Sequence, residues 1–132
     1  MRHIVLGLMI VAALIAATVP LMAHHSFAAE FDNQKQIKLT GVVTKVDWTN
    51  PHVWFYFNVK DENGTVTNWG AEMGPPHLLQ GSGWTRTTMK IGDTIIVQGS
   101  LAKNGSKRLN ARNVTTPDGK KMGAASSEGV TP

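Results

Sequence analysis

Apolar and polar residues alternate most regularly over residues 52–60, where the sequence reads HVWFYFNVK. In an extended strand, every second side chain points to the same face of the sheet. One face is entirely apolar and consists of Val53, Phe55, Phe57 and Val59. The other face carries His52, Trp54, Tyr56 and Asn58. A register shift of one residue would put an imidazole, a phenol and an amide into the core, so the apolar set is predicted to face inward.

A first strand is predicted over 39–48 (LTGVVTKVDW), because this stretch is rich in β-branched residues. Gly41 within it is the expected bend, where one long strand would turn to serve both halves of a barrel. A turn at 49–51 should follow, since Pro51 cannot donate to a β-ladder and restricts the residue before it.

A hairpin is predicted at residues 61–64, because Asn63-Gly64 is a strong signal for a two-strand turn. The return strand covers 65–73 (TVTNWGAEM). Alternation predicts that Trp69, Ala71 and Met73 point inward and that Asn68 and Glu72 point outward.

The second half of the chain continues with turn signals and shorter apolar runs. We predict a loop at 74–83, a short helical turn at 84–90 with Thr85 as its N-cap, a fourth strand at 94–101, an Asn-Gly hairpin at 103–106 and a fifth strand at 107–115. The fifth strand is polar enough to be an edge or to have one wet face. Residues 117–132 lack the apolar groups that offset ordering entropy and are predicted to form a flexible tail.

These elements predict an all-β fold, a small five-stranded Greek-key barrel of the oligonucleotide/oligosaccharide-binding (OB) type. The long connection between the third and fourth strands, with a short helical turn in it, is typical of that architecture. A five-stranded sandwich fragment is the alternative. The predicted barrel domain spans 39–116, and residues 24–38 form a separate N-terminal segment rich in His and Phe.

The N-terminal residues 1–23 are typical of a secretory signal peptide, with a basic start and an apolar run that ends before Pro20. The run is shorter than the ~20 residues of a membrane-spanning helix, which makes an uncleaved anchor the lesser alternative. Cleavage after Ala23 or after Ala28 fits the pattern. After cleavage, no integral membrane segment is expected.

Composition excludes several kinds of site. The 132 residues contain no Cys, so disulfides, thiolate metal sites and a thiol nucleophile are all absent. The excess of 13 Lys and Arg over 9 Asp and Glu is mild and spread along the chain. Nucleic-acid-binding proteins concentrate these residues on one stripe, so nucleic acid is not the favoured partner.

Five segments resemble a family of small exported bacterial proteins of unknown function, and together they cover about 24–116. They read HHSFAAEFD (24–32), LTGVVTKVDWTNPHVWFYFNVKDENGTVTNW (39–69), EMG (72–74), GWTR (83–86) and KIGD (90–93). The most specific part is WTNPHVWFYF. The resemblance implies export to the periplasm of a Gram-negative cell and cleavage after Ala23. It brings no catalytic residues with it.

A metal hypothesis rests on the histidines. Cleavage after Ala23 would give His24 a free amine beside its imidazole, and nitrogen ligands of this kind suit Cu(II). His25, His52 and His77 are the other candidates, with His24, His25 and His52 as the preferred set. The alternative is a polar start to the mature chain with no metal, in which His52 caps a turn and His77 is solvated.

A second hypothesis places a ligand on the outward side of the second strand. Trp54 and Tyr56, flanked by His52 and by Trp48, could form an aromatic platform on which sugars or bases stack. The alternative is that the N-terminal segment or the loop at 74–84 covers these rings.

No carboxylate pair, nucleophile setting or phosphate-binding loop appears in the sequence, so an enzyme is not expected. The favoured function is an exported, periplasmic, non-enzymatic module that binds a small ligand or an envelope protein and requires no cofactor. The alternatives are a copper-binding protein and a binder of polysaccharide or single-stranded polyanion. The last would combine the aromatic face with Lys107, Arg108 and Arg112.

Overall fold

A computed structural model describes Met1 and residues 27–128. Within this part of the chain, no helix is long and apolar enough to cross a membrane. The elements, in chain order, are α2 (Phe27–Glu30), β1 (Phe31–Asp47), β2 (Trp54–Lys60), β3 (Val66–Glu72), α3 (Pro76–Gly81), β4 (Thr94–Ala102), β5 (Arg108–Thr115) and β6 (Lys121–Gly123).

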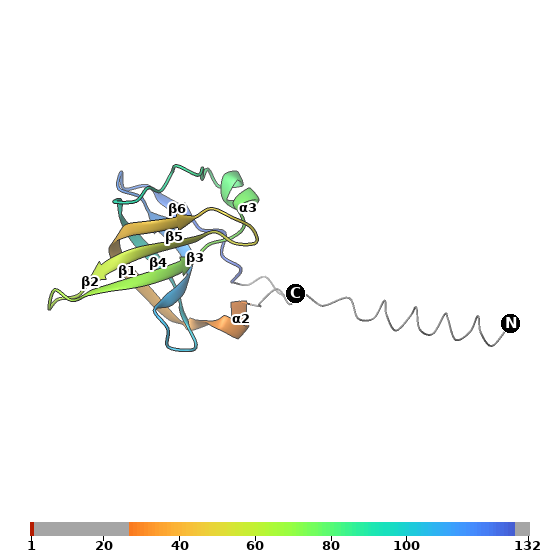
Figure 1. Cartoon of the computed structure of the whole chain (residues 1–132), viewed down its shortest axis with the longest axis horizontal. Coiled ribbons are helices and arrows are strands. Elements are labelled where there is room, and N and C mark those ends of the chain that lie inside the picture. The colour runs from red at the N-terminus through yellow and green to blue at the C-terminus, as the bar shows by residue number, and fades with distance from the viewer. Residues whose placement is uncertain (2–26, 129–132) are drawn as a thin grey trace.

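The strands form one closed sheet in the order β3-β2-β1-β4-β5-β6 (Figure 1). All neighbours in this order pair antiparallel, and an additional parallel pairing between β3 and β5 closes the ring. A five-stranded Greek-key barrel with this order has the OB architecture. The predicted fold class is therefore confirmed, with β6 as a strand beyond the five expected.

Strand β1 belongs to both halves of the barrel. It pairs with β4 from Phe31 to Val42 and with β2 from Val42 to Asp47, so the change of partner falls next to Gly41. A Cβ at Gly41 would lie 2.5 Å from the Asn58 carbonyl oxygen, which explains why this position has no side chain. Gly41 was predicted to sit where one strand serves both halves, and the pairing confirms this. The strand starts earlier than predicted because its first, polar part is held by the ladder to β4 rather than by an apolar face.

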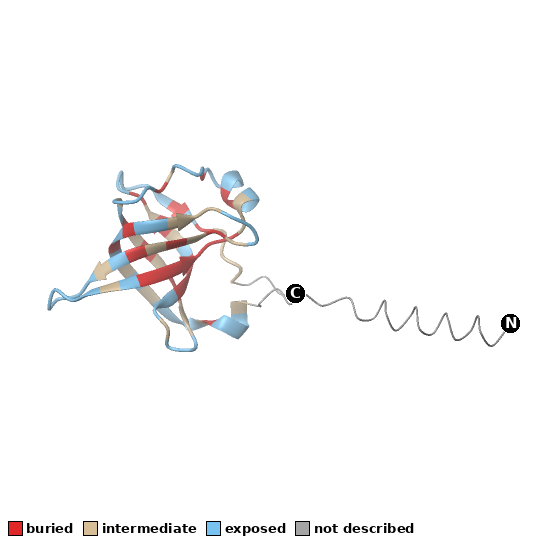
Figure 2. Ribbon diagram, viewed as in Figure 1, coloured by how far each residue is buried: buried red, intermediate tan, exposed pale blue. Residues whose placement is uncertain are grey.

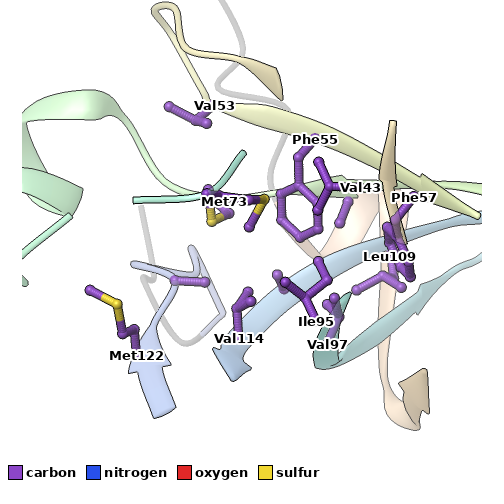
Figure 3. Packing of buried hydrophobic residues seen from close by; sticks show 14 of the residues in the cluster. Val43, Val53, Phe55, Phe57, Met73, Ile95, Val97, Leu109, Val114 and Met122 are labelled. Carbon is purple, nitrogen blue, oxygen red and sulfur yellow. The ribbon is translucent and has the colours of Figure 1, made fainter. Parts of the chain in front are cut away.

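The barrel interior contains the side chains predicted from the alternation along β2 (Figures 2 and 3). Val53, Phe55 and Phe57 are fully buried, and Val59 packs partly buried against the same core. From β3, Trp69 and Ala71 also point inward, as does Met73 just after its end. The partition of inward and outward positions is confirmed.

The short helix predicted between the third and fourth strands is confirmed, but its predicted position at 84–90 is wrong: it lies at Pro76–Gly81, in the predicted loop, as α3. Pro76 begins this helix, where a missing N–H costs nothing, and Leu79 is buried against the barrel. Residues 85–88 form only a turn, in which the Thr88 N–H donates to the Thr85 carbonyl oxygen at 3.2 Å. Trp84 is a core residue, 1% exposed, and its Nε1–H donates to the Gly123 carbonyl at 2.8 Å.

The C-terminal part differs from the prediction in two respects. Of the two alternatives for the fifth strand, an edge or one wet face, the edge is excluded, because β5 pairs with β3, β4 and β6. The chain after Pro117 is not loose as far as it is described: Met122 and Ala124 are buried, and Arg112 pairs with Glu128. Composition was misleading here, since a short ladder and two apolar side chains are enough to order the segment.

Candidate ligand-binding face

The outer face of the barrel carries a row of side chains that runs across four strands. Lys45 on β1 pairs with Tyr56 on β2, Tyr56 pairs with Gly70 on β3, and Gly70 pairs with Arg108 on β5. Phe55 and Phe57 point inward, so Tyr56 and its partners point outward. We call the surface formed by Lys45, Trp54, Tyr56 and Arg108 the aromatic face.

The two rings of the aromatic face lie side by side, each beside a cation. The centroids of Trp54 and Tyr56 are 6.5 Å apart and their planes differ by 22°. Arg108 Cζ lies 5.4 Å from the Trp54 centroid, and Lys45 Nζ lies 5.4 Å from that of Tyr56. Both distances are within the range of cation–π attraction. Lys45 also contacts Asp47 at 2.9 Å, and this hydrogen bond raises the pKa of Lys45.

Gly70 makes room for this arrangement. A Cβ at this position would lie 3.2 Å from Tyr56 Cε1 and 3.7 Å from Arg108 Cγ. The Tyr56 ring can therefore lean over β3 toward Arg108 without meeting a side chain in between. The cationic and aromatic groups are thereby brought together over the backbone of β3.

An open hollow of about 580 Å³ borders the aromatic face. Its lining residues are Val46, Asp47, Trp48, Thr49, Trp54, Tyr56 and Arg108. Trp48 thus flanks the two rings as the sequence predicted. Both rings are half-buried, which leaves part of each accessible from the hollow.

Beside Trp54, His52 contacts Glu72, with 2.5 Å between Nδ1 and Oε1. Glu72 pairs with Trp54 across β2 and β3, so it belongs to the outer side of the sheet as predicted, yet it is only 6% exposed. Burial raises the pKa of Glu72 to about 7, and the nearby charge of Glu30 adds to the effect. Alternation predicts that the Glu72 side chain lies on the outer side of the sheet, but it cannot predict that other residues bury it there. The sequence therefore did not reveal the buried contact between His52 and Glu72.

The structure brings together three of the predicted site residues, since His52, Trp54 and Tyr56 share the outer side of β2 and its entry. His24 and His25, proposed as metal ligands, lie outside the described residues. His77 is exposed on α3. Within residues 27–128, no group of three or more His, Asp or Glu side chains is arranged to hold a metal ion.

The three cations suggested by the sequence do not form one patch. Arg108 belongs to the aromatic face, but Lys107 lies over the Trp69 ring at 5.3 Å and Arg112 pairs with Glu128. The second cation of the aromatic face is Lys45 instead, which lies beside Tyr56. It was missed because its partnership with Tyr56 depends on a β-bulge between Val43 and Lys45, which alternation cannot predict.

A family model described as a family of unknown function, DUF6152, matches residues 12–110. The chain belongs to this family. The match includes β1 to β4 and the first residues of β5, and with them every residue of the aromatic face. No curated protein matches the chain.

Several solved structures are similar in fold. The ZRD-deleted mutant of TiaS in complex with agmatine has 21% identity and a TM-score of 0.45, over 64% of this chain and 21% of that one. The N-terminal domain of PriB from Thermoanaerobacter tencongensis has 14% identity and a TM-score of 0.40, over 63% and 96%. A structure of yeast Stn1 and Ten1 has 16% identity and a TM-score of 0.42, over 61% and 42%. The chain thus spans about a fifth of the TiaS chain.

Proposed function

We propose that this protein is an exported, non-catalytic binding module of the periplasm, and that it binds an acidic polysaccharide on the aromatic face. One observation carries the proposal: Trp54 and Tyr56 lie side by side at an open hollow with Arg108 and Lys45 beside them. Flat rings accept the apolar faces of sugars, and the cations pair with carboxylates.

The nature of the polymer follows from where the protein is expected to be. The signal-peptide pattern of residues 1–23 supports export, and nucleic acid is scarce outside the cytoplasm. An acidic polysaccharide has the same repeating negative charge and is a component of the envelope. No cofactor is needed for such binding.

The proposal predicts that Trp54→Ala and Tyr56→Ala each weaken binding of polygalacturonate about ten- to a hundred-fold, the effect of losing one aromatic stacking partner. Isothermal titration calorimetry with the processed protein would measure this. Binding should also weaken as salt rises from 50 to 200 mM, because exposed charges are screened.

The matched control is Ile91→Ala, which removes an exposed apolar side chain, 72% exposed, outside the aromatic face. It should leave binding unchanged. The proposal would be contradicted if the Trp54 and Tyr56 variants bound as tightly as the native protein, or if only single-stranded oligonucleotides bound.

A second candidate function is copper binding by His24, His25 and His52. The observation that favours it is the contact between His52 Nδ1 and the buried Glu72 carboxylate. A metal-ligating histidine commonly uses one ring nitrogen for the metal and donates the other N–H to a carboxylate. Glu30, six residues after His24, lines a hollow together with Trp54, which lies two residues after His52.

For copper, N-terminal sequencing of the exported protein should find His24 as the first residue. Cu(II) at about 100 times its dissociation constant should then raise the free energy of unfolding by about 2.7 kcal/mol. His24→Ala and His52→Ala should each lose most of this increase, while His77→Ala serves as the matched control. A mature chain that starts at Ala29 would exclude the copper function.

A further inference from the structure

A set of polar side chains continues the aromatic face along β2. Asn58 follows Tyr56 by two residues, so it lies on the same outer side of the sheet, roughly 7 Å further along the strand. Asn58 pairs with Asn68 on β3, just as Tyr56 pairs with Gly70. Thr44 on β1 completes the set, and all three polar residues are exposed. We call Thr44, Asn58 and Asn68 the amide cluster.

Two hydrogen bonds fix the side chains of the amide cluster. Asn68 Nδ2 donates to Asn58 Oδ1 at 2.8 Å and to Thr44 Oγ1 at 3.2 Å. Because β2 lies between β1 and β3, the Asn68 side chain crosses over β2 to reach Thr44. Thr44 is the extra residue of the β-bulge between Val43 and Lys45. The bulge that supplies Lys45 to the aromatic face therefore also supplies Thr44 to the amide cluster.

These bonds leave one donor group and one acceptor of the two amides available to a ligand. A side-chain amide has two N–H groups and one carbonyl oxygen. Both N–H groups of Asn68 are used within the cluster, and the Asn58 oxygen accepts one of them. Among the described residues 27–128, Asn58 Nδ2 and Asn68 Oδ1 have no hydrogen-bond partner. Since the bonds orient both amides, these two groups form an exposed donor next to an exposed acceptor.

A donor beside an acceptor is complementary to two adjacent hydroxyl groups, because each hydroxyl can both donate and accept a hydrogen bond. Directly opposed residues such as Asn58 and Asn68 have Cβ atoms about 4.5–5.5 Å apart. At this separation the two amides can bond to neighbouring hydroxyls of one sugar ring. The units of polygalacturonate carry such a pair at O2 and O3. A DNA strand has no adjacent hydroxyls along its chain, so this chemistry favours a sugar polymer.

We infer that the amide cluster binds a pair of adjacent ring hydroxyls of the acidic polysaccharide, so that the protein selects polymers in which these hydroxyls are free. One unit stacks on Tyr56. A hydroxyl of the next unit along β2 accepts from Asn58 Nδ2, and its neighbour donates to Asn68 Oδ1. An acetyl ester removes the hydroxyl hydrogen and adds bulk, so acetylated polymers are rejected. This inference rests on the proposed function and adds a rule for which polymers are bound.

The test is calorimetric titration of the processed protein with polygalacturonate and with the same polymer acetylated at O2 and O3. The native protein should bind the acetylated polymer about ten- to a hundred-fold more weakly, the effect of losing two hydrogen bonds. Asn58→Ala and Asn68→Ala should each weaken binding of the free polymer about three- to ten-fold. The double variant should bind both polymers alike. Gln80→Ala, an exposed amide on α3, is the matched control and should keep the native affinity and preference.

Two results would overturn the hydroxyl subsite alone. The first is a native protein that binds both polymers equally, while Trp54→Ala still weakens binding. The second is a double variant that keeps the native preference for the free polymer, which would show that the discrimination arises away from Asn58 and Asn68. A native protein that binds an oligothymidylate but neither form of polygalacturonate would overturn the proposed function together with the inference.

Discussion

Phe55→Ala is expected to lower the free energy of unfolding by about 3–5 kcal/mol, the usual cost of removing a buried phenylalanine ring. Phe55 is 0% exposed, and its ring centroid lies 5.6 Å from that of Phe57 inside the barrel. The loss combines the transfer of the ring to water with the cavity it leaves. Because the free energy of unfolding of a small domain is only about 5–15 kcal/mol, this variant should be close to unfolding at 37 °C.

Urea denaturation followed by tryptophan fluorescence would measure the change. The midpoint should fall without a large change in slope, which would indicate a change in stability rather than in the unfolded state. Lys60→Ala, at the exposed end of β2, is the control and should stay within about 0.5 kcal/mol of the native protein. A greater loss for Trp54→Ala than for Phe55→Ala would contradict the assignment of inward and outward sides along β2.

Glu72→Gln is expected to change how stability depends on pH. The pKa of Glu72 is raised by burial from 4.5 to about 7. Between these values the folded protein holds a proton that the unfolded chain has lost, so native stability falls as pH rises through this range. A shift of this size corresponds to up to about 3 kcal/mol. Gln is neutral at every pH and keeps a hydrogen-bond acceptor for His52. The stability of the variant should therefore not fall as pH rises through this range.

The measurement is the unfolding midpoint at pH 4.5 to 8.5, with a chelator present to remove metal ions. Glu72→Gln should be more stable than the native protein above pH 7, and the difference should vanish near pH 4.5. Glu62→Gln, an exposed carboxylate in the turn between β2 and β3, is the matched control and should not change the pH profile. A Glu72→Gln variant that is less stable at pH 8 would show that the contact between His52 and the ionised Glu72 outweighs the cost of burial.

The barrel could be predicted from the sequence where local signals and long-range packing agree. The alternation along β2 is unbroken, and the Asn63-Gly64 turn fixes how β3 returns: the Asp61 N–H donates to the Thr65 carbonyl oxygen at 2.9 Å, and Gly64 has a φ of 83°. α3 and β6 could not be predicted in the same way. These two elements form because of contacts with the rest of the barrel, such as those that bury Leu79 and Met122.

The same distinction applies to the candidate site. Trp54 and Tyr56 follow from alternation, because they lie opposite a continuous apolar set on one strand. The positions of Arg108 and Lys45 depend on the pairing of β5 with β3 and on a bulge in β1, and neither has a local sequence signal. The burial of Glu72 likewise depends on what covers the outer side of the sheet.

The double pairing of β1 has a consequence for how the molecule unfolds. One continuous strand of 17 residues hydrogen-bonds to β4 through its first part and to β2 through its second. Neither half of the barrel can melt while the other keeps its full ladder, since both would lose the strand they share. Unfolding should therefore be a single cooperative transition, and a substitution that weakens either end of β1 should destabilise the entire domain.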